Sequence, residues 1–433
     1  MSDADTRARA DACNRDGAAL AGAGQFDAAL ARFDAALALR PDHVKALDNR
    51  ASVLQLLGRV DAAVRDSDAA LAIAPDRWET LYNRGLILSA AGRLREALGC
   101  FQRVAALRPD RADAAFNEGV TRLALGDYAV GWPLHERRWE TGQLPPPPAF
   151  PQPAWRGATD IVGKTILLYS EQGFGDTLQF CRYAALLAER TRVVLLVPPP
   201  LRRVVATVSD RVQVVDNGNR LPAFDLQCPL PSLPLAFGTT LDTIPATMPY
   251  LHADPSRVAI WAERLARLSG RRIGLVWAGQ SGGERIEHRM RDQRRSLALA
   301  QFAPLGALHG ISFVSLQKGE AATQLVALSG GLVLHEWTRE LADFAETAAL
   351  VMALDLVITV DTAVAHLAGA LNKPVWILNR FDACWRWLRD RTDSPWYPRA
   401  RLFRQPKPGD WDSVIADVVL ALREMIGVHA QAR

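Results

Sequence analysis

Two stretches of the sequence combine a carboxylate, small residues and a predicted passage from a strand to a helix. In the first, a strand ending in LLY is followed by the loop SEQGFGD, which places Asp176 at a helix start. Gly173 and Gly175 allow the backbone there to approach a ligand closely. The Asp176 carboxylate could take the proton from an acceptor hydroxyl, which by itself is a poor nucleophile, or it could only cap the helix. Glu171, beside Gln172, is a second candidate base.

The second stretch is LDLVITVDTAVAHLAGAL, in which a buried strand over 356–360 precedes a helix of small residues over 364–371. Asp361 and Thr362 form the turn between them. Backbone N–H groups at the start of such a helix make an anion site that fits a nucleotide diphosphate. His366 lies about one turn into the helix and could face the same ligand. A capped core helix with a hydrogen-bonded histidine is the alternative.

A third stretch is rich in arginine. The strand GLVWA leads through Gly279 into ERIEHRMRDQRR, where five arginines stand against three acidic residues. We expect most of them to be solvated and one, Arg295, to stabilise the charge that develops on a leaving phosphate. At the end of the next strand, in SLQKG, Lys318 is a point charge suited to a phosphate. A surface lysine is the alternative for that position.

The tryptophans of DACWRWL and SPWYP could stack on a base or a sugar, or could lie in the core. We expect the core for Trp385 and leave both options open for Trp396. No cluster of metal-ligating residues, Walker A sequence or G-x-S-x-G elbow accompanies these motifs in the sequence. A mechanism without a metal or other cofactor is therefore the simpler hypothesis.

A helical repeat array precedes the segments that must position these residues. Over the first third of the chain, glycine, proline and small residues recur every 34 positions, the period of the tetratricopeptide repeat. Glycine is expected at the turn within each helix pair and proline after the second helix, while small residues let the two helices approach. Phe33 and Phe101 fill a large apolar position, from which Ser67 departs. The concave groove of such an array predicts a protein or peptide partner, with an oligomerisation or scaffolding arm as the alternative. The recurring positions include Gly24, Gly58, Gly92 and Gly126; Pro41, Pro75 and Pro109; and Gly17, Ala51, Gly85 and Gly119.

Beyond the proline-rich stretch QLPPPPAFPQPAW, apolar β-rich runs alternate with helical patterns, which indicates parallel sheets covered on both faces. Two such α/β lobes in series bind ligands in the cleft between them, at the carboxyl ends of the strands. We expect a repeat domain over 1–142, a stiff linker over 143–157, a first lobe over 158–253 and a second lobe over 254–433. The predicted strands are 165–169, 193–197, 212–216, 225–228, 273–277, 311–316, 332–334, 356–360 and 375–378, and the predicted helices include 176–189, 255–268, 342–353 and 364–371.

Composition and charge exclude other classes of protein. The net charge of +4 is too balanced for a nucleic-acid binder. The five cysteines form no C-x-x-C pair, and scattered thiols fit a reducing cytoplasm. The N-terminal residues lack an apolar signal-peptide core, and no stretch approaches the roughly 18 apolar residues that span a bilayer. The sequence therefore predicts a cytoplasmic protein without a membrane span.

Taken together, these motifs resemble the family 9 glycosyltransferases, which include the lipopolysaccharide heptosyltransferases. VDTAVAHLAGAL is similar to the donor-site motif of that family, and EQGFGDTLQF to the glycine–aspartate loop of its first lobe. LVWAG, RRSL, SLQKG, DFAETAAL, SPWYP and RLFRQ stand in the expected order, so nearly the whole chain resembles the bacterial tetratricopeptide-repeat glycosyltransferases. The domain order is also similar to that of O-GlcNAc transferase.

The resemblance implies a GT-B fold with two Rossmann-like lobes, inversion at the anomeric carbon, a nucleotide-sugar donor and no metal. It makes Asp176 the catalytic base, with Arg295 standing where heptosyltransferases carry a phosphate-binding lysine. The residues expected to bind the donor are Asp361, Thr362, Ala363, His366, Arg295, Lys318 and Gly279, and those of the acceptor loop are Glu171, Gln172, Gly173 and Gly175.

The acceptor and two other functions stay open at this point. Heptosyltransferases lack the repeats, so their lipid-linked acceptor is not carried over, and the repeats favour a protein acceptor. A non-catalytic scaffold with a degenerate transferase unit is the first alternative. A nucleotide-sugar epimerase is the second, although the repeats argue against it because an epimerase needs no protein acceptor.

Overall fold

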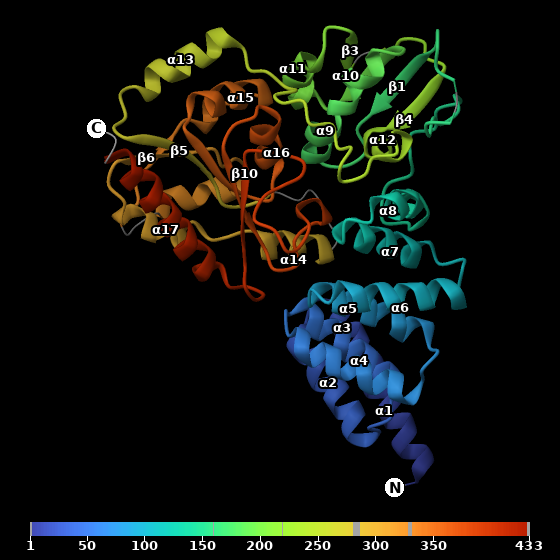
Figure 1. Cartoon of the computed structure of the whole chain (residues 1–433). Coiled ribbons are helices and arrows are strands. Elements are labelled where there is room, and N and C mark those ends of the chain that lie inside the picture. The colour runs from blue at the N-terminus through green and yellow to red at the C-terminus, as the bar shows by residue number, and fades with distance from the viewer. Residues whose placement is uncertain (1, 159, 219, 280–285, 328–330, 431–433) are drawn as a thin grey trace. The chain divides into compact units, whose positions relative to one another are not determined.

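The structure, a computed structural model, describes residues 2–158, 160–218, 220–279, 286–327 and 331–430 (Figure 1). The chain divides into two units, Met1–Pro146 with Gly283–Met290, and Pro147–Gly282 with Arg291–Arg433. Every regular element described in the first unit is helical, whereas the second unit holds two β-sheets. The predicted fold class, a helical repeat array followed by an α/β unit, is therefore confirmed.

The repeat array is built of helix pairs whose boundaries keep the 34-residue period. Each of its glycine turns adopts a positive φ, between 73° and 85°, which a residue with a Cβ atom adopts only at a cost. The second helix of each of the first three pairs ends two residues before a proline, which cannot continue a helix. The helices are α1 (Asp3–Gly22), α2 (Phe26–Leu39), α3 (Val44–Leu56), α4 (Val60–Ile73), α5 (Trp78–Ala90), α6 (Leu94–Leu107), α7 (Ala112–Ala124) and α8 (Tyr128–His135), followed by the 3-10 turn η1 (Glu136–Glu140).

Two helix pairs are held by the same contact between a glycine and a phenylalanine ring. A Cβ atom placed on Gly17 would lie 2.6 Å from the Phe33 ring, and one placed on Gly85 would lie 2.5 Å from the Phe101 ring. Both rings are completely or almost completely buried. The absence of a side chain on the first helix thus lets the ring of the second helix pack directly against its backbone.

The second repeat departs from this contact at both positions together. Ala51 replaces the glycine and Ser67 replaces the phenylalanine, so a larger residue on one helix faces a smaller one on the other. Both are buried, and the Ser67 hydroxyl donates to the Val64 carbonyl at 2.8 Å and accepts from Arg84 at 3.1 Å. The departure of Ser67 noted in the sequence is therefore compensated within its own helix pair.

The second unit contains two all-parallel sheets. The first has the strand order β3-β2-β1-β4 and the second β10-β9-β8-β5-β6-β7. Counted within its own lobe, the second order is that of a doubly wound dinucleotide-binding fold, and the first is its opening half. The strands are β1 (Thr165–Tyr169), β2 (Arg192–Val197), β3 (Val212–Asp216), β4 (Leu226–Pro229), β5 (Arg271–Val276), β6 (Ile311–Ser315), β7 (Leu334–Glu336), β8 (Leu356–Val360), β9 (Val375–Asn379) and β10 (Ala400–Arg404).

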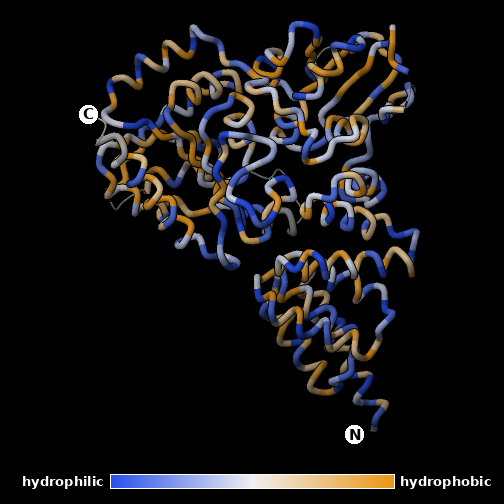
Figure 2. The backbone as a smooth tube through the Cα atoms, in the orientation of Figure 1, coloured by the Kyte–Doolittle hydropathy of each residue, from blue (hydrophilic) through white to orange (hydrophobic). Residues whose placement is uncertain are grey.

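Helices cover both faces of the second sheet. On one face α15 packs against α13 and contacts α16, and on the other η5 and α17 enclose the apolar core of the lobe, which includes Ile358 and Phe403. Figure 2 shows the hydrophobic colouring that follows the buried strands of both sheets. The helices and 3-10 turns are α9 (Phe174–Phe180), α10 (Arg182–Ala188), η2 (Pro199–Leu201), α11 (Arg202–Val205), η3 (Ala206–Val208), η4 (Leu230–Ser232), α12 (Leu233–Ala236), α13 (Pro255–Leu265), α14 (Ile286–Arg295), η5 (Leu299–Ala307), η6 (Glu320–Ala327), η7 (Thr338–Glu340), α15 (Phe344–Ala353), α16 (Ala363–Ala370), η8 (Trp385–Trp387) and α17 (Trp411–Ala430).

The nine predicted strands are present, each within two residues at either end, and one further strand was missed. The missed strand is β10, whose sequence ARLFR mixes arginines with apolar residues and so lacks the continuous apolar run of a buried strand. The helix predicted over 176–189 is also wrong in one respect, because the structure divides it at Cys181 into α9 and α10.

Candidate active site

The loop after β1 brings Asp176 to the first turn of α9, where both carboxylate oxygens have partners. Gly173 is the N-cap residue of α9, and its backbone N–H donates to Asp176 Oδ2 at 3.1 Å. A capping role for this aspartate is therefore present. The other oxygen, Oδ1, accepts a hydrogen bond from the Arg386 guanidinium, which belongs to the other lobe. The Asp176 side chain is only 18% exposed, so this ion pair is largely screened from solvent.

The turn after β8 places Thr362 at the N-cap of α16, with Asp361 before it and Ala363 as the first helical residue. The Thr362 hydroxyl pairs with that of Thr359 at 3.0 Å and does not cap the helix. The Ala365 N–H donates to the Thr362 carbonyl at 3.0 Å, and the N–H groups of Ala363 and Val364 before it belong to the positive end of the helix. The turn thus has the geometry that can receive a phosphate group.

His366 is buried in α16 and held on two sides. Its Nδ1 atom pairs with the Tyr397 hydroxyl at 2.8 Å, and its ring stacks on Trp387 with 5.4 Å between ring centres. Burial, followed by the charges of Arg386 and Arg182, holds the pKa of His366 well below its ordinary value. The imidazole is therefore neutral at physiological pH, and its position is fixed.

The two motifs of the sequence meet directly in the structure. A Cβ atom placed on Gly175 would lie 2.7 Å from His366 Cδ2 and 3.7 Å from Ala363 Cα. The loop that carries Asp176 consequently lies against the first turns of α16. Strands β1 and β8 occupy the positions in their sheets where the strand order reverses, and ligands of doubly wound folds bind at the carboxyl ends of such strands.

Two arginines that the sequence analysis did not select lie at the same place. Arg386 donates from Nε to Gln179 at 2.6 Å and from Nη1 to Cys384 at 3.1 Å, in addition to its bond with Asp176. Its position between two tryptophans in DACWRWL was the signal that could have identified it, because an arginine among buried aromatic residues needs a specific partner.

Arg182 is the other arginine, and it joins the two lobes from within. Its guanidinium is buried and donates to the carbonyls of Gln179, Pro245 and Trp396 and to the Tyr250 hydroxyl, at 2.9 to 3.2 Å. Trp385 and Trp396 are both buried. The core position expected for Trp385 is therefore confirmed, and of the two options left open for Trp396 the core is the correct one.

The structure also brings together Gly279, Arg295 and Asp361. A Cβ atom on Gly279 would lie 2.6 Å from the centre of the Arg295 guanidinium, and Arg295 donates to the Asp361 carbonyl at 3.1 Å. Arg295 also forms an ion pair with Asp292. Of the arginine-rich stretch, Glu284 and Arg285 lie outside the described residues, as does the side chain of Arg291.

The other three predicted site residues are Lys318, Glu171 and Gln172. Lys318 is exposed and donates to the Leu341 carbonyl, just before α15. Glu171 and Gln172 are half-buried and bond to each other at 3.0 Å in the loop before α9. They lie on the same loop as Asp176.

Several buried polar atoms near the carboxyl ends of the strands have no hydrogen-bond partner in the described part of the chain. Asn379 ends β9 completely buried with both side-chain atoms unpaired, and the Trp387 indole N–H and one Gln179 amide nitrogen are unpaired as well. Buried polar groups are normally satisfied by protein, water or ligand. No group of three or more metal-ligating side chains gathers among the described residues.

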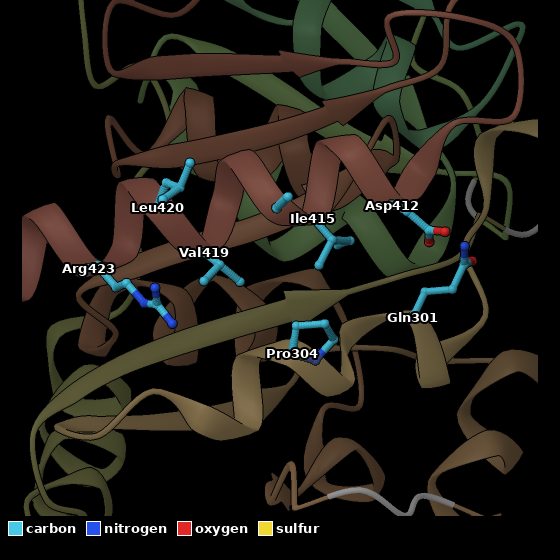
Figure 3. A pocket seen from close by; sticks show the side chains of 8 residues that line it. Gln301, Pro304, Asp412, Ile415, Val419, Leu420 and Arg423 are labelled. Carbon is cyan, nitrogen blue, oxygen red and sulfur yellow. The ribbon is translucent and has the colours of Figure 1, made fainter.

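A surface hollow lies elsewhere in the second unit. Figure 3 shows its lining, which comes from η5 (Gln301, Pro304) and from one side of α17 (Asp412, Ile415, Val419, Leu420). It includes none of the predicted site residues.

Two models of known protein families match separate parts of the chain. The tetratricopeptide repeat model matches residues 17–77 and 82–131, and the model of glycosyltransferase family 9 (heptosyltransferase) matches residues 335–378, which include Asp361, Thr362 and His366. Protein FlbA of Caulobacter vibrioides is 28% identical over 333 residues, which cover 70% of this chain and 53% of FlbA. The chain thus spans about half the length of the curated relative it matches.

The solved structures that are similar to part of this chain include MamA and a tetratricopeptide domain. MamA from Desulfovibrio magneticus RS-1 is 23% identical, with a TM-score of 0.29, over 31% of this chain and 76% of that structure. The first tetratricopeptide domain of human RPAP3 is 23% identical, with a TM-score of 0.27, over 28% of this chain and 94% of that structure. None of the helices that the structure describes combines the length and apolarity needed to cross a bilayer.

Proposed function

Because the chain joins tetratricopeptide repeats to a glycosyltransferase family 9 domain, we propose that it is an inverting glycosyltransferase of GT-B type. It transfers a sugar from a nucleotide-sugar to an acceptor hydroxyl, with the nucleotide-sugar bound by the second lobe. The acceptor in this proposal is a protein held by the repeats, and the reaction takes place in the cytoplasm.

The observation that carries the proposal is the contact of Gly175 with His366 and Ala363. It sets a carboxylate, that of the next residue Asp176, beside the positive end of α16. A sugar joined to a diphosphate has its anomeric carbon only a few bonds from the phosphate. A carboxylate close to a phosphate site is therefore placed to act on a nucleophile approaching that carbon.

In the proposed reaction the acceptor oxygen attacks the anomeric carbon while the bond from that carbon to the diphosphate oxygen breaks. The electron pair of the broken bond leaves with the diphosphate, and the hydroxyl proton passes to the Asp176 carboxylate. Attack from the side opposite to the leaving group inverts the configuration at the carbon. A general base of this kind contributes about 10²- to 10⁴-fold to the rate.

The leaving diphosphate gains negative charge, which the protein must stabilise. The first-turn N–H groups of α16 and the Arg295 guanidinium at the Asp361 turn supply fixed positive charge at that point. We propose that these groups serve without a metal ion. His366, neutral and fixed by Tyr397, orients the ligand by a hydrogen bond and adds no charge.

The repeats are proposed to hold the acceptor protein on their inner face. Helix α3 packs against both α1 and α5, and in this proposal the odd-numbered helices line the groove. Asn49, Asn83 and Asn117 occupy the same position of three successive odd helices and are half-buried. Asn49 donates to Asn14, and Asn117 donates to Tyr82 and to the Asp113 carbonyl, so the side-chain oxygens are the groups proposed to accept from an extended peptide backbone.

The test is a screen of nucleotide-sugars by calorimetry with the full chain, followed by mass spectrometry of proteins that the full chain captures. Asp176→Asn is expected to keep donor binding and to reduce transfer by 10²-fold or more. Glu171→Gln is the matched control on the same loop. If Asp176→Asn transfers at nearly the wild-type rate and Glu171→Gln does not, Glu171 is the base.

A non-catalytic adaptor is the second candidate, and one observation favours it. Both oxygens of Asp176 already have hydrogen-bond partners, as a purely structural carboxylate would. The same screen separates the two functions, because an adaptor with a degenerate site would bind no nucleotide-sugar while still capturing its protein partner.

A further inference from the structure

Arg386 lies at the point where the two motifs meet. Its Nη2 atom is bound to Asp176 on α9, and the next residue, Trp387, stacks on His366 of α16. Arg386 is thus flanked by the proposed base on one side and by the helix of the proposed phosphate site on the other. Its side chain is 13% exposed, so an anion reaching it would be largely desolvated.

The arginine is anchored independently of the aspartate. Its Nε atom donates to Gln179 at 2.6 Å and its Nη1 atom donates to Cys384 at 3.1 Å. Of its three nitrogens, only Nη2 depends on Asp176. The guanidinium can therefore remain in place while the acceptor at Nη2 changes.

The bond at Nη2 conflicts with the role proposed for Asp176. A carboxylate that takes a proton from a hydroxyl loses its negative charge, so protonation of Asp176 would leave the partly buried Arg386 without its anion. Oδ2 is engaged by the Gly173 N–H and Oδ1 by Arg386. Pulling the two charges apart without a substitute is costly, because each would remain partly buried and unpaired.

A phosphate group of the donor supplies that substitute. Phosphate and carboxylate oxygens both accept charge-assisted bonds from guanidinium, and a planar guanidinium suits a phosphate well. Burial acts against the charge of Arg386, but the carboxylates of Asp176 and Asp361 raise its pKa, so it stays protonated and available to an anion.

We propose that Arg386 exchanges anions: without donor it binds Asp176, and when the donor binds at α16 its Nη2 atom moves to a phosphate oxygen and releases Asp176 Oδ1 to accept the acceptor proton. This inference rests on the proposed transferase function. Its consequence is that the base becomes free only in the presence of the donor. Arg386 is then a phosphate ligand and a switch, and the donor binds before the acceptor.

Inorganic pyrophosphate is the probe, because it carries the phosphate chemistry without a sugar or a nucleoside. Its dissociation constant is measured by calorimetry at constant ionic strength for the full-length wild type, D176N, R386Q and the D176N/R386Q double variant. D176N is expected to bind about 10-fold more tightly, because Arg386 no longer has to give up a carboxylate. R386Q is expected to bind about 10-fold more weakly, and D176N is expected to add nothing in the R386Q background.

The control for a general charge effect is D343N. Asp343 pairs with Arg203 at 3.0 Å, also between the two lobes, but at the start of α15. Asparagine can still cap that helix through its side-chain oxygen. D343N removes the same charge as D176N and is expected to leave the dissociation constant within twofold of the wild type.

Each result decides the matter. A gain in D176N that persists in the R386Q background reflects charge alone and overturns the exchange, as does an unchanged dissociation constant in D176N. In either case the wild type still binds pyrophosphate, and the transferase proposal stands. If no variant binds pyrophosphate, the phosphate site itself is absent and both proposals are wrong. Should R386Q fail to fold, R386K replaces it, and the comparison of D176N with D343N still tests the exchange.

Discussion

The repeat array and the candidate active site use the same packing device over very different distances along the chain. In the array, the lack of a side chain on Gly85 lets the Phe101 ring pack against the backbone within one helix pair, and Gly17 does the same for Phe33. In the site, the lack of a side chain on Gly175 leaves room for the His366 ring of the other lobe. The first contact repeats with the period of the sequence, whereas the second joins two motifs that share no local pattern.

The difference shows what each glycine is for. In the array the ring is an apolar side chain, and its approach to the backbone buries surface and stabilises the helix pair. In the site the ring is an imidazole held by Tyr397 and Trp387, and the approach sets Asp176 beside α16. Substitution should therefore affect mainly stability in the first case and mainly catalysis in the second.

The largest effect is expected for Gly175→Ala. The new Cβ atom would lie 2.7 Å from His366 Cδ2, and His366 cannot yield because Tyr397 and Trp387 hold it. The loop with Asp176 must move instead, and a shift of about 1 Å in a catalytic group costs roughly 100-fold in rate. The rate of sugar transfer with the donor found in the screen is the measurement.

Gly173→Ala is the matched control for this prediction. Gly173 lies on the same loop, and a Cβ atom there would lie 3.5 Å from Asp176 Oδ2, which is an ordinary contact. A loss of activity equal to that of Gly175→Ala would mean that any added methyl group on the loop disturbs the site, and the special role given to the His366 contact would be wrong.

The sequence could predict the two motifs separately but not the residue that connects them. Glycine, aspartate and histidine stood out because they follow apolar strands at the carboxyl edge of a parallel sheet. Arg386 follows β9 only after a loop, and its partner Asp176 is 210 positions away. No periodicity relates such residues, so the ion pair emerges only once both lobes are folded and packed.

The next effect in size is expected for Gly85→Ala in the array. The added Cβ atom would lie 2.5 Å from the Phe101 ring, and overpacking of this kind costs about 1–3 kcal/mol. Hydrogen exchange of peptides from α5 and α6, read by mass spectrometry in the full chain, is the measurement. Exchange should quicken about 5-fold for each kcal/mol, while peptides of α16 keep their wild-type rates.

The array was the most predictable part of the molecule because its contacts are local and recur. The glycine turns, the prolines and the paired small and large positions all follow from the 34-residue register. Ser67 departs from the large position of this register, and Ala51 departs from the small position that it is paired with. Strand β10 was missed for the opposite reason, because its arginine-containing sequence has no repeat and no continuous apolar run to identify it.

A smaller effect is expected from the titration of His366. Its pKa is held well below the ordinary value by burial and by Arg386 and Arg182, so the folded chain keeps it neutral where the unfolded chain binds a proton. In the unfolded chain the pKa of this histidine is about 6.5. At higher pH its titration does not change the free energy of unfolding, and at lower pH proton binding to the unfolded chain reduces that free energy. Between pH 7 and pH 5.5 the wild type should lose about 1 kcal/mol more than His366→Asn.

Urea unfolding followed by tryptophan fluorescence at the two pH values measures this loss. Asparagine can still pair with the Tyr397 hydroxyl, so the variant removes the titration while keeping a polar partner. Replacing the exposed His309 by glutamine is the control. Equal pH dependence in the wild type and His366→Asn would show that the histidine is hydrated rather than sealed against Trp387.

The smallest effect should have the opposite sign. Gly99 lies exposed in the middle of α6, one helix after Gly85, and nothing would lie within 4 Å of an added Cβ atom. Gly99→Ala should stabilise α6 by about 0.5–1 kcal/mol, because alanine loses less backbone freedom than glycine on entering a helix. The same hydrogen-exchange experiment measures it as slower exchange of α6 peptides. An added methyl group would then destabilise the helix pair at Gly85 and stabilise it at Gly99. If Gly99→Ala destabilises α6 instead, the array needs glycine because of backbone conformation and not because of the space that a ring takes.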